Sequence, residues 1–254
     1  MGITKQGKVA VLTNYREDKS VQAIGAHSRG RIVSSWLTSA PDERETTHSF
    51  VQGMVASPEA RQVGGFSLVC GRINEPLAIV SNRSSDMDHI TWVATENNQT
   101  RGLSNTSVDD RTWPKILNGE KLMQEAIEKH VQAQQNEDAL IESLLDVLHV
   151  DTLPPLPKGE TKMENCIKQL RNSIFIPVIG SDDDIDCAAR EAALNNGSMD
   201  PSYTSGPYGT QKQTVLLAQR DGRVRYFERT LYDGNVNEVP KGQGDRSFEF
   251  HVEQ

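Results

Sequence analysis

Three short apolar runs, separated by turn-forming residues, constrain the fold of this chain more than any other feature of its sequence. The runs cover residues 66–71, 77–81 and 90–94, and the residues between them are rich in Asn, Gly, Pro and Asp. Apolar runs of this length, bounded by such residues, are typical of strands joined by tight turns. The sequence therefore predicts an antiparallel meander of three strands in the first half of the chain.

The segments that precede the meander predict one more strand and two helices. Residues 8–15 (KVAVLTNY) form a short apolar run typical of a buried strand. Residues 28–38 place their apolar side chains on one helix face, and Ser28 is the expected N-cap. A second short helix is predicted around residues 50–54. The N-terminal part of the chain thus combines strands with helices.

The C-terminal half repeats this mixture in another order. Apolar residues recur at helical spacing between Pro114 and Val131 and again from Glu137 to Val150, which predicts two amphipathic helices. Asp221-Gly222 lies between two apolar runs, a strong hairpin signal. Segregated helices and antiparallel strands predict an α+β fold of one domain over residues 1–254. The other predicted elements are strands at 173–179, 214–219, 223–229 and 248–252, and a long acidic polar loop at about 180–207.

Charge, cysteine content and hydropathy exclude several classes of protein. The formal net charge is −8, so no basic surface for nucleic acid is expected. Three widely spaced cysteines fit neither a disulfide framework nor a zinc site, which favours a reducing, cytoplasmic compartment. No apolar stretch approaches the roughly 20 residues of a transmembrane helix. Cys70 lies inside a predicted strand, where a small core residue is expected.

A set of short motifs follows a fixed order along the chain: residues 2–3 (GI), 7–8 (GK), 12–16 (LTNYR), 28–30 (SRG), 102–105 (GLSN), 144–148 (LLDVL), 173–175 (SIF), 208–210 (YGT) and the hairpin from 214 to 229. Together these motifs resemble the NRDE family of the transport and Golgi organisation 2 type. Members of that family usually begin with Met-Cys and carry an Asn-Arg-Asp-Glu tetrapeptide ahead of the position equivalent to Gly2. Neither feature is present here, so we expect a truncated gene model or a shorter isoform that lacks the first strand.

The resemblance implies an αββα sandwich like that of N-terminal nucleophile hydrolases, in which stacked antiparallel sheets are covered by helices. It also implies roles in Golgi organisation and protein secretion, in mitochondrial and lipid or acyl-CoA metabolism, and in haem trafficking, with peripheral association with Golgi or mitochondria. Because the N-terminal nucleophile Cys is absent, we expect a non-enzymatic factor that binds an amphipathic metabolite such as haem. The alternative is an amide or acyl hydrolase, active only in a full-length form.

The same resemblance places candidate ligand-binding residues at strand ends and loops, where the binding pocket of an αββα fold would lie. His27 is the candidate axial ligand of haem, with Arg29 and Arg31 nearby as candidates to meet its propionates; the alternative for His27 is a surface loop residue. Turn formation is the alternative for Ser104 and Asn105, and an ion pair with a carboxylate is the alternative for Arg29. No resident metal or cofactor is expected. The complete candidate set is Asn14, Arg16, His27, Arg29, Ser104, Asn105, Tyr208 and Thr210.

Overall fold

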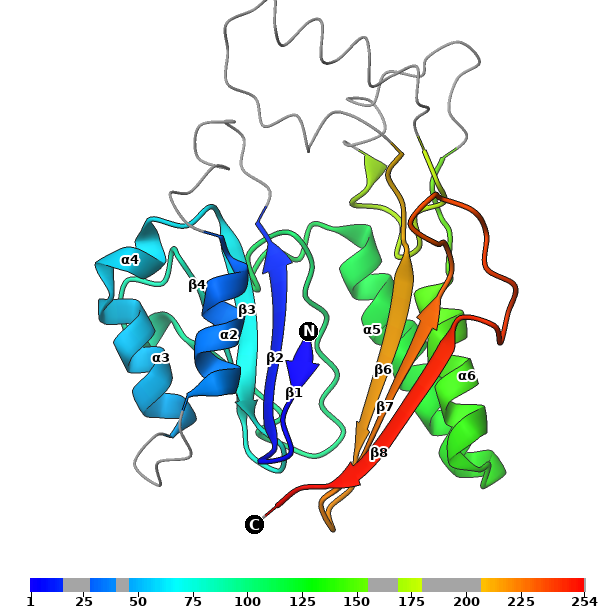
Figure 1. Ribbon diagram of the computed structural model, residues 1–254, viewed down its shortest axis with the longest axis horizontal. Helices are drawn as coiled ribbons and strands as arrows, with labels where there is room; N and C mark the ends of the chain where they lie inside the picture. Colours follow the sequence, from blue (N-terminus) through cyan, green and yellow to red (C-terminus); the bar gives the residue numbers. More distant parts are fainter. Residues whose placement is uncertain (16–27, 40–45, 155–168, 180–206, 254) are drawn as a thin grey trace, which may run out of the picture. The chain divides into compact units, whose positions relative to one another are not determined.

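The computed structural model describes residues 1–15, 28–39, 46–154, 169–179 and 207–253, which form two compact units (Figure 1). The first unit contains Met1–Asp110, Ala218–Val224 and Glu249–Gln254, and the second contains Arg111–Leu217 and Arg225–Phe248. Both units combine helices with antiparallel strands, which confirms the predicted α+β class. The αββα sandwich stays a prediction.

The first unit is built on a five-stranded antiparallel sheet in the order β1-β2-β3-β4-β5. The predicted meander is confirmed as β3, β4 and β5, and the predicted strand from residue 8 is confirmed as β2. The two-residue strand β1 was not predicted, because it is too short to show a period of apolar residues. The bounds are β1 Gly2–Ile3, β2 Lys8–Asn14, β3 Phe66–Arg72, β4 Leu77–Ser81 and β5 Thr91–Val93.

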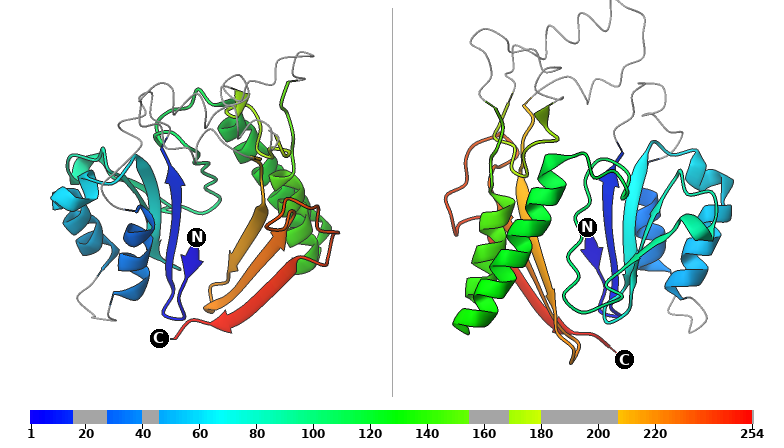
Figure 2. Two further views of the ribbon diagram at one scale, coloured as in Figure 1. Left: turned by 45° about the horizontal axis from the view of Figure 1, so that its top comes forward. Right: turned by 180° about the vertical axis from the view of Figure 1, so that it is seen from behind.

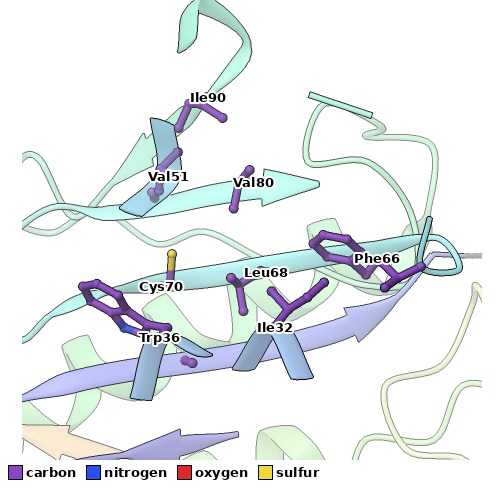
Figure 3. Close-up of a cluster of buried hydrophobic side chains, with 11 residues drawn as sticks. Ile32, Trp36, Val51, Phe66, Leu68, Cys70, Val80 and Ile90 are labelled. Carbon is purple, nitrogen blue, oxygen red and sulfur yellow. The ribbon is translucent and has the colours of Figure 1, made fainter. Parts of the chain in front are cut away.

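Helices α2 (Gly30–Thr38) and α3 (Thr47–Ala56) pack on one face of this sheet, as both views in Figure 2 show; the four-residue helix α4 (Pro58–Arg61) follows α3. The register aligns Ala10 with Cys70 and Cys70 with Ala78, so that small residues form a row across the sheet. Larger side chains fill the space around this row, among them Trp36, Phe66, Leu68 and Val51 (Figure 3). Small residues on the strands therefore make room for the bulky residues of the helices.

The start of α2 differs from the prediction by one residue. Arg29, not Ser28, occupies the N-cap position, and it makes no side-chain capping hydrogen bond. The Ser28 hydroxyl instead accepts a hydrogen bond from the Gly30 amide at 3.3 Å, while the Ser28 carbonyl accepts one from the Arg31 amide at 3.2 Å. Ser28 therefore forms a turn ahead of the helix, a common alternative use of a serine hydroxyl.

Strands β6, β7 and β8 form a three-stranded sheet in that order, most of which belongs to the second unit; helix α6 packs on this sheet, and α5 packs against α6. The predicted hairpin is confirmed: β6 and β7 are joined by a turn in which Gly222 has a φ of 88°, a conformation that suits glycine. Ile141 and Leu145 of α6 are buried against Val215 of β6. The bounds are α5 Pro114–Ala133, α6 Glu137–Leu148, β6 Lys212–Ala218, β7 Arg223–Thr230 and β8 Asp245–His251.

The prediction of a strand over residues 173–179 is wrong. This stretch makes only an isolated antiparallel bridge between Ile179 and Tyr208. Phe175 and Ile176 are buried, but Pro177 has no amide hydrogen and interrupts a ladder of backbone hydrogen bonds. The Ile176 amide donates to the Thr210 hydroxyl at 2.9 Å instead of to a strand. The predicted acidic loop at 180–207 lies outside the described residues, apart from Pro207.

None of the helices in the described parts of the chain has both the length and the apolar character that crossing a membrane requires.

Candidate functional site

A cavity of about 530 Å³ lies in the first unit, among helices α2, α3 and α4. We call it the α2–α3 cavity. Its volume is within the roughly 300–1,000 Å³ of typical small-molecule sites. The lining residues are Arg31, Ile32, Ser35, Ser49, Phe50, Gly53, Met54, Ser57, Ala60 and Val63.

The floor of the α2–α3 cavity is the edge of the hydrophobic core. Ile32 and Val63 line the cavity and also belong to the buried core cluster. Phe50 lines it too, and its ring lies 4.8 Å from that of Trp36, centroid to centroid. The floor is therefore held by packed side chains, and a ligand on it would contact apolar surface that is already rigidly placed.

Small residues at four-residue spacing hollow out the α3 side of the cavity. Ser49, Gly53 and Ser57 are four positions apart, so they lie on one face of the helical segment. A Cβ atom added at Gly53 would meet no atom within 4 Å. The space beside this face is thus open because the sequence supplies no side chain large enough to fill it.

Arg31 is the one charged side chain that lines the cavity. It is exposed, and it has no ion-pair partner among the residues that the structure describes. The hydroxyls of Ser35 and Ser57 are engaged by backbone groups, the first donating to the Ile32 carbonyl at 2.8 Å and the second accepting from the Ala60 amide at 3.3 Å. A guanidinium at the rim of an apolar hollow suits a ligand with an apolar body and a carboxylate or phosphate.

The structure brings together three of the predicted site residues at the end of β2. Asn105 donates a side-chain hydrogen bond to the Asn14 carbonyl at 2.8 Å. The neighbouring Thr13 hydroxyl donates to the Ser104 carbonyl at 3.2 Å. These bonds fasten the 102–105 loop to the strand, which is a structural use of Ser104 and Asn105. A role in ligand binding for these residues and for Asn14 stays a prediction.

The remaining predicted residues have different settings. Arg29 lies one residue before α2, in the first unit. Tyr208 and Thr210 belong to the second unit, where Thr210 is tied to Ile176 by both its amide and its hydroxyl. Arg16 and His27 lie outside the described residues.

The Met54 thioether is the only soft metal ligand among the residues that line the α2–α3 cavity. The lining contains no histidine: His48 is stacked on Trp92, and His149 lies against Phe175 in the second unit. Across the described ranges, no group of three or more His, Cys, Asp or Glu side chains could hold a metal ion. Sequence reasoning identified the helix that carries Met54 but not its role in a cavity wall.

Cys70 is predicted to be chemically inert in the folded protein. Its side chain is completely buried in the core, and burial raises the pKa of its thiol to about 12, so the nucleophilic thiolate does not form near neutral pH. Alkylation with iodoacetamide at pH 8, followed by peptide mass spectrometry, should modify Cys70 in urea and leave it unmodified in buffer. Rapid modification of the native protein would contradict the assignment of Cys70 as a core residue.

Comparisons with known proteins extend over nearly the whole chain. A profile of the family described as Transport and Golgi organisation 2 matches residues 1–233. The Transport and Golgi organization 2 homolog of Mus musculus is 25% identical over 242 aligned residues, covering 93% of this chain and 73% of the mouse protein. The Homo sapiens homolog is 27% identical over 258 aligned residues, which cover 100% of this chain and 78% of the human protein. An uncharacterized Saccharomyces cerevisiae protein is 19% identical over 265 aligned residues, which cover 99% of this chain and 81% of the yeast protein.

Proposed function

Because the chain belongs to the Transport and Golgi organisation 2 family, we propose that it supports Golgi organisation and secretion by binding an amphipathic metabolite, preferably haem, in the α2–α3 cavity. The observation that carries this proposal is the combination of an apolar floor with the single charged residue Arg31. A ligand with one apolar and one acidic part matches both features. Acyl-CoA and lipid acids share this general character and are the competing ligands.

The apolar part of the ligand would be held by burial. Ile32, Phe50 and Val63 present hydrocarbon surface that is already in place before binding. Covering such surface stabilises a complex by about 25 cal/mol for each Å² of apolar area removed from water. Helices α2 and α3, which carry Ile32 and Phe50, are themselves anchored on the sheet by the core in Figure 3. Little further ordering of this floor is then needed when a ligand binds.

The acidic part would be held by Arg31, with Arg29 as a second basic group near the start of the same helix. Haem adds one further requirement, a group that can bind its iron. The Met54 thioether meets this requirement from within the cavity wall, and thioethers are established axial ligands of haem iron. A single thioether is a weak ligand, which suits a protein that must release its cargo.

The test is a titration of the purified chain with haem, followed by Soret absorbance. We expect saturable one-to-one binding that Arg31→Ala weakens about tenfold, because one charge-assisted contact to a propionate is lost. Arg101→Ala is the matched control, since Arg101 is also an exposed arginine of the first unit but does not line the cavity. Unsaturable binding, or equal weakening by both variants, would contradict the proposed site.

Two further variants identify the iron ligand. Met54→Leu keeps the size and apolar character of the side chain but removes the sulfur, so it should shift the Soret band while leaving most of the affinity. His27→Ala tests the imidazole predicted from the sequence. A band shift in the second variant alone would assign the ligand to His27. If titration with haem gives no Soret change and the wild type binds palmitoyl-CoA, an acyl ligand in the same cavity is favoured instead.

A further inference from the structure

A second cavity, of about 320 Å³, lies in the second unit at the C-terminal end of α6. We call it the α6 cavity. Its wall includes Asp146 and His149 from the end of α6, Phe175 from the irregular stretch, and Gln213 from β6. The other side is formed by the end of β7 and the segment that follows it, up to Lys241. Every residue of this wall belongs to one unit.

Gln213 is the unusual member of this wall. Its side chain is 4% exposed, yet its amide nitrogen has no hydrogen-bond partner among the described residues. Buried amides in proteins are almost always paired, and an unpaired one calls for a specific explanation. The terminal amide group can also turn over, exchanging the positions of its oxygen and nitrogen. Gln213 therefore holds unused hydrogen-bonding capacity, as donor or acceptor, in the wall of a cavity.

The charges around the α6 cavity favour a positive ligand. Arg229 is neutralised by Glu142 and Asp245, with shortest contacts of 2.7 Å to each, and Lys241 contacts Glu142 at 2.7 Å. The cations of the wall are thus already paired. Asp146 and Glu238 also line the cavity, and neither has an ion-pair partner within the described part of the chain. The C-terminal end of α6 adds the negative end of a helix dipole.

Aromatic side chains complete a site for an organic cation. The His149 and Phe175 rings lie 4.3 Å apart, centroid to centroid, and Tyr232 is a third ring in the wall. Aromatic faces attract alkylated ammonium groups, which are large and weakly hydrated, better than they attract small inorganic ions. The volume also exceeds what an inorganic ion would need and lies at the small end of organic ligand sites.

We propose that the α6 cavity binds a small organic cation that also carries a hydroxyl or carbonyl group. Asp146 and Glu238 face the positive charge, the aromatic rings contact its alkyl groups, and the Gln213 amide pairs with the oxygen. This site is separate from the α2–α3 cavity and does not depend on the function proposed there. The two cavities share no lining residue.

Choline is the probe, and the neutral 3,3-dimethylbutan-1-ol, which has nearly the same shape, is the matched control ligand. We would titrate each into the full chain and follow the NMR signals of Gln213 and Tyr232. Choline should shift these signals in a saturable manner, and the neutral alcohol should bind at least about tenfold more weakly because it lacks the charge. The absence of saturable shifts, or equal binding of the two ligands, would overturn the proposal.

Two substitutions separate ligand binding from folding. Asp146→Asn, at an exposed position, should weaken choline binding about fivefold, whereas Glu125→Gln on the exposed part of α5 should leave it unchanged. Gln213→Leu should weaken binding about tenfold without lowering the melting temperature, because an apolar group of similar size replaces an unpaired buried amide. Unchanged choline binding in Asp146→Asn and in Gln213→Leu would refute the site.

Discussion

Replacing Trp36 with Ala is expected to lower the free energy of unfolding by about 4 kcal/mol, the typical cost of removing a large buried aromatic side chain. Trp36 is fully buried, and its indole N–H donates to the Val9 carbonyl at 3.0 Å. Its ring also lies beside that of Phe50 and 4.7 Å from the Lys8 amino group. The substitution would leave a cavity, a carbonyl without its indole donor and a buried ammonium group without its aromatic neighbour. Urea denaturation followed by circular dichroism measures the loss.

Trp36→Phe is the matched control for this experiment. Phenylalanine keeps most of the apolar area but cannot donate to the Val9 carbonyl, so we expect a smaller loss of about 1–3 kcal/mol. A loss below about 1 kcal/mol in Trp36→Ala would contradict the core shown in Figure 3. The same experiment tests the predicted single domain. If the units unfold together, probes in the second unit will report the same lowered midpoint as probes in the first.

Replacing Arg229 with Met should destabilise the protein by about 3 kcal/mol, because it leaves two carboxylates without their shared cation. The Arg229 side chain is 9% exposed and makes two hydrogen bonds to Asp245 and two to Glu142. We expect the lower part of the usual range for a broken buried pair, since the Glu142 side chain is 41% exposed and solvent screens it. Thermal unfolding at pH 7 measures the effect.

The acid side of the stability curve gives a second signature of the same cluster. Hydrogen bonds from Arg229, and then from Lys241, lower the pKa of Glu142 from 4.5 to about 2. A carboxylate whose pKa is lowered by folding stabilises the fold at pH values above its unfolded-state pKa. This contribution is lost as the pH falls from about 4.5 to about 2. In Arg229→Met the pKa of Glu142 should rise, so stability should fall less steeply over this interval than in the wild type.

Lys241→Met is the control that distinguishes the buried cation from the exposed one. Lys241 also contacts Glu142, but its side chain is 70% exposed. An exposed ion pair contributes at most about 1 kcal/mol, so this variant should be nearly as stable as the wild type. Equal losses of stability in Lys241→Met and Arg229→Met would show that the buried Arg229 guanidinium contributes no more than the exposed Lys241 ammonium group.

The sequence predicted the elements whose periodicity is strong. The meander of β3, β4 and β5, the two long helices and the hairpin around Gly222 all follow from apolar spacing and turn chemistry. Residues 173–179 show where that reasoning fails. An apolar run indicates burial, but whether its backbone joins a sheet depends on neighbours such as Thr210 that lie far away in the sequence.

The candidate site was harder to predict than the fold. Burial of Cys70 follows from its place in an apolar run, but the α2–α3 cavity exists because small residues on α3 face a hollow beside α2. The four-residue spacing of Ser49, Gly53 and Ser57 is visible in the sequence. That these small residues line the same cavity as Ile32 and Val63 is a property of the tertiary structure. Arg31 was predicted as a basic group for an acidic ligand; the structure places it in the lining of the α2–α3 cavity, and its role in binding stays a prediction.

The division of the first unit into three separate pieces of chain has a consequence for biosynthesis. The Glu253 amide donates to the Lys5 carbonyl at 2.8 Å, and the Gln6 side chain donates to the Glu253 carboxylate at 3.1 Å. During synthesis, residue 5 emerges from the ribosome long before residue 253, because the chain grows by only about 5–20 residues each second. The turn between β1 and β2 therefore lacks these two hydrogen bonds until residue 253 has been made, so the last contacts of the first unit can form only late in synthesis.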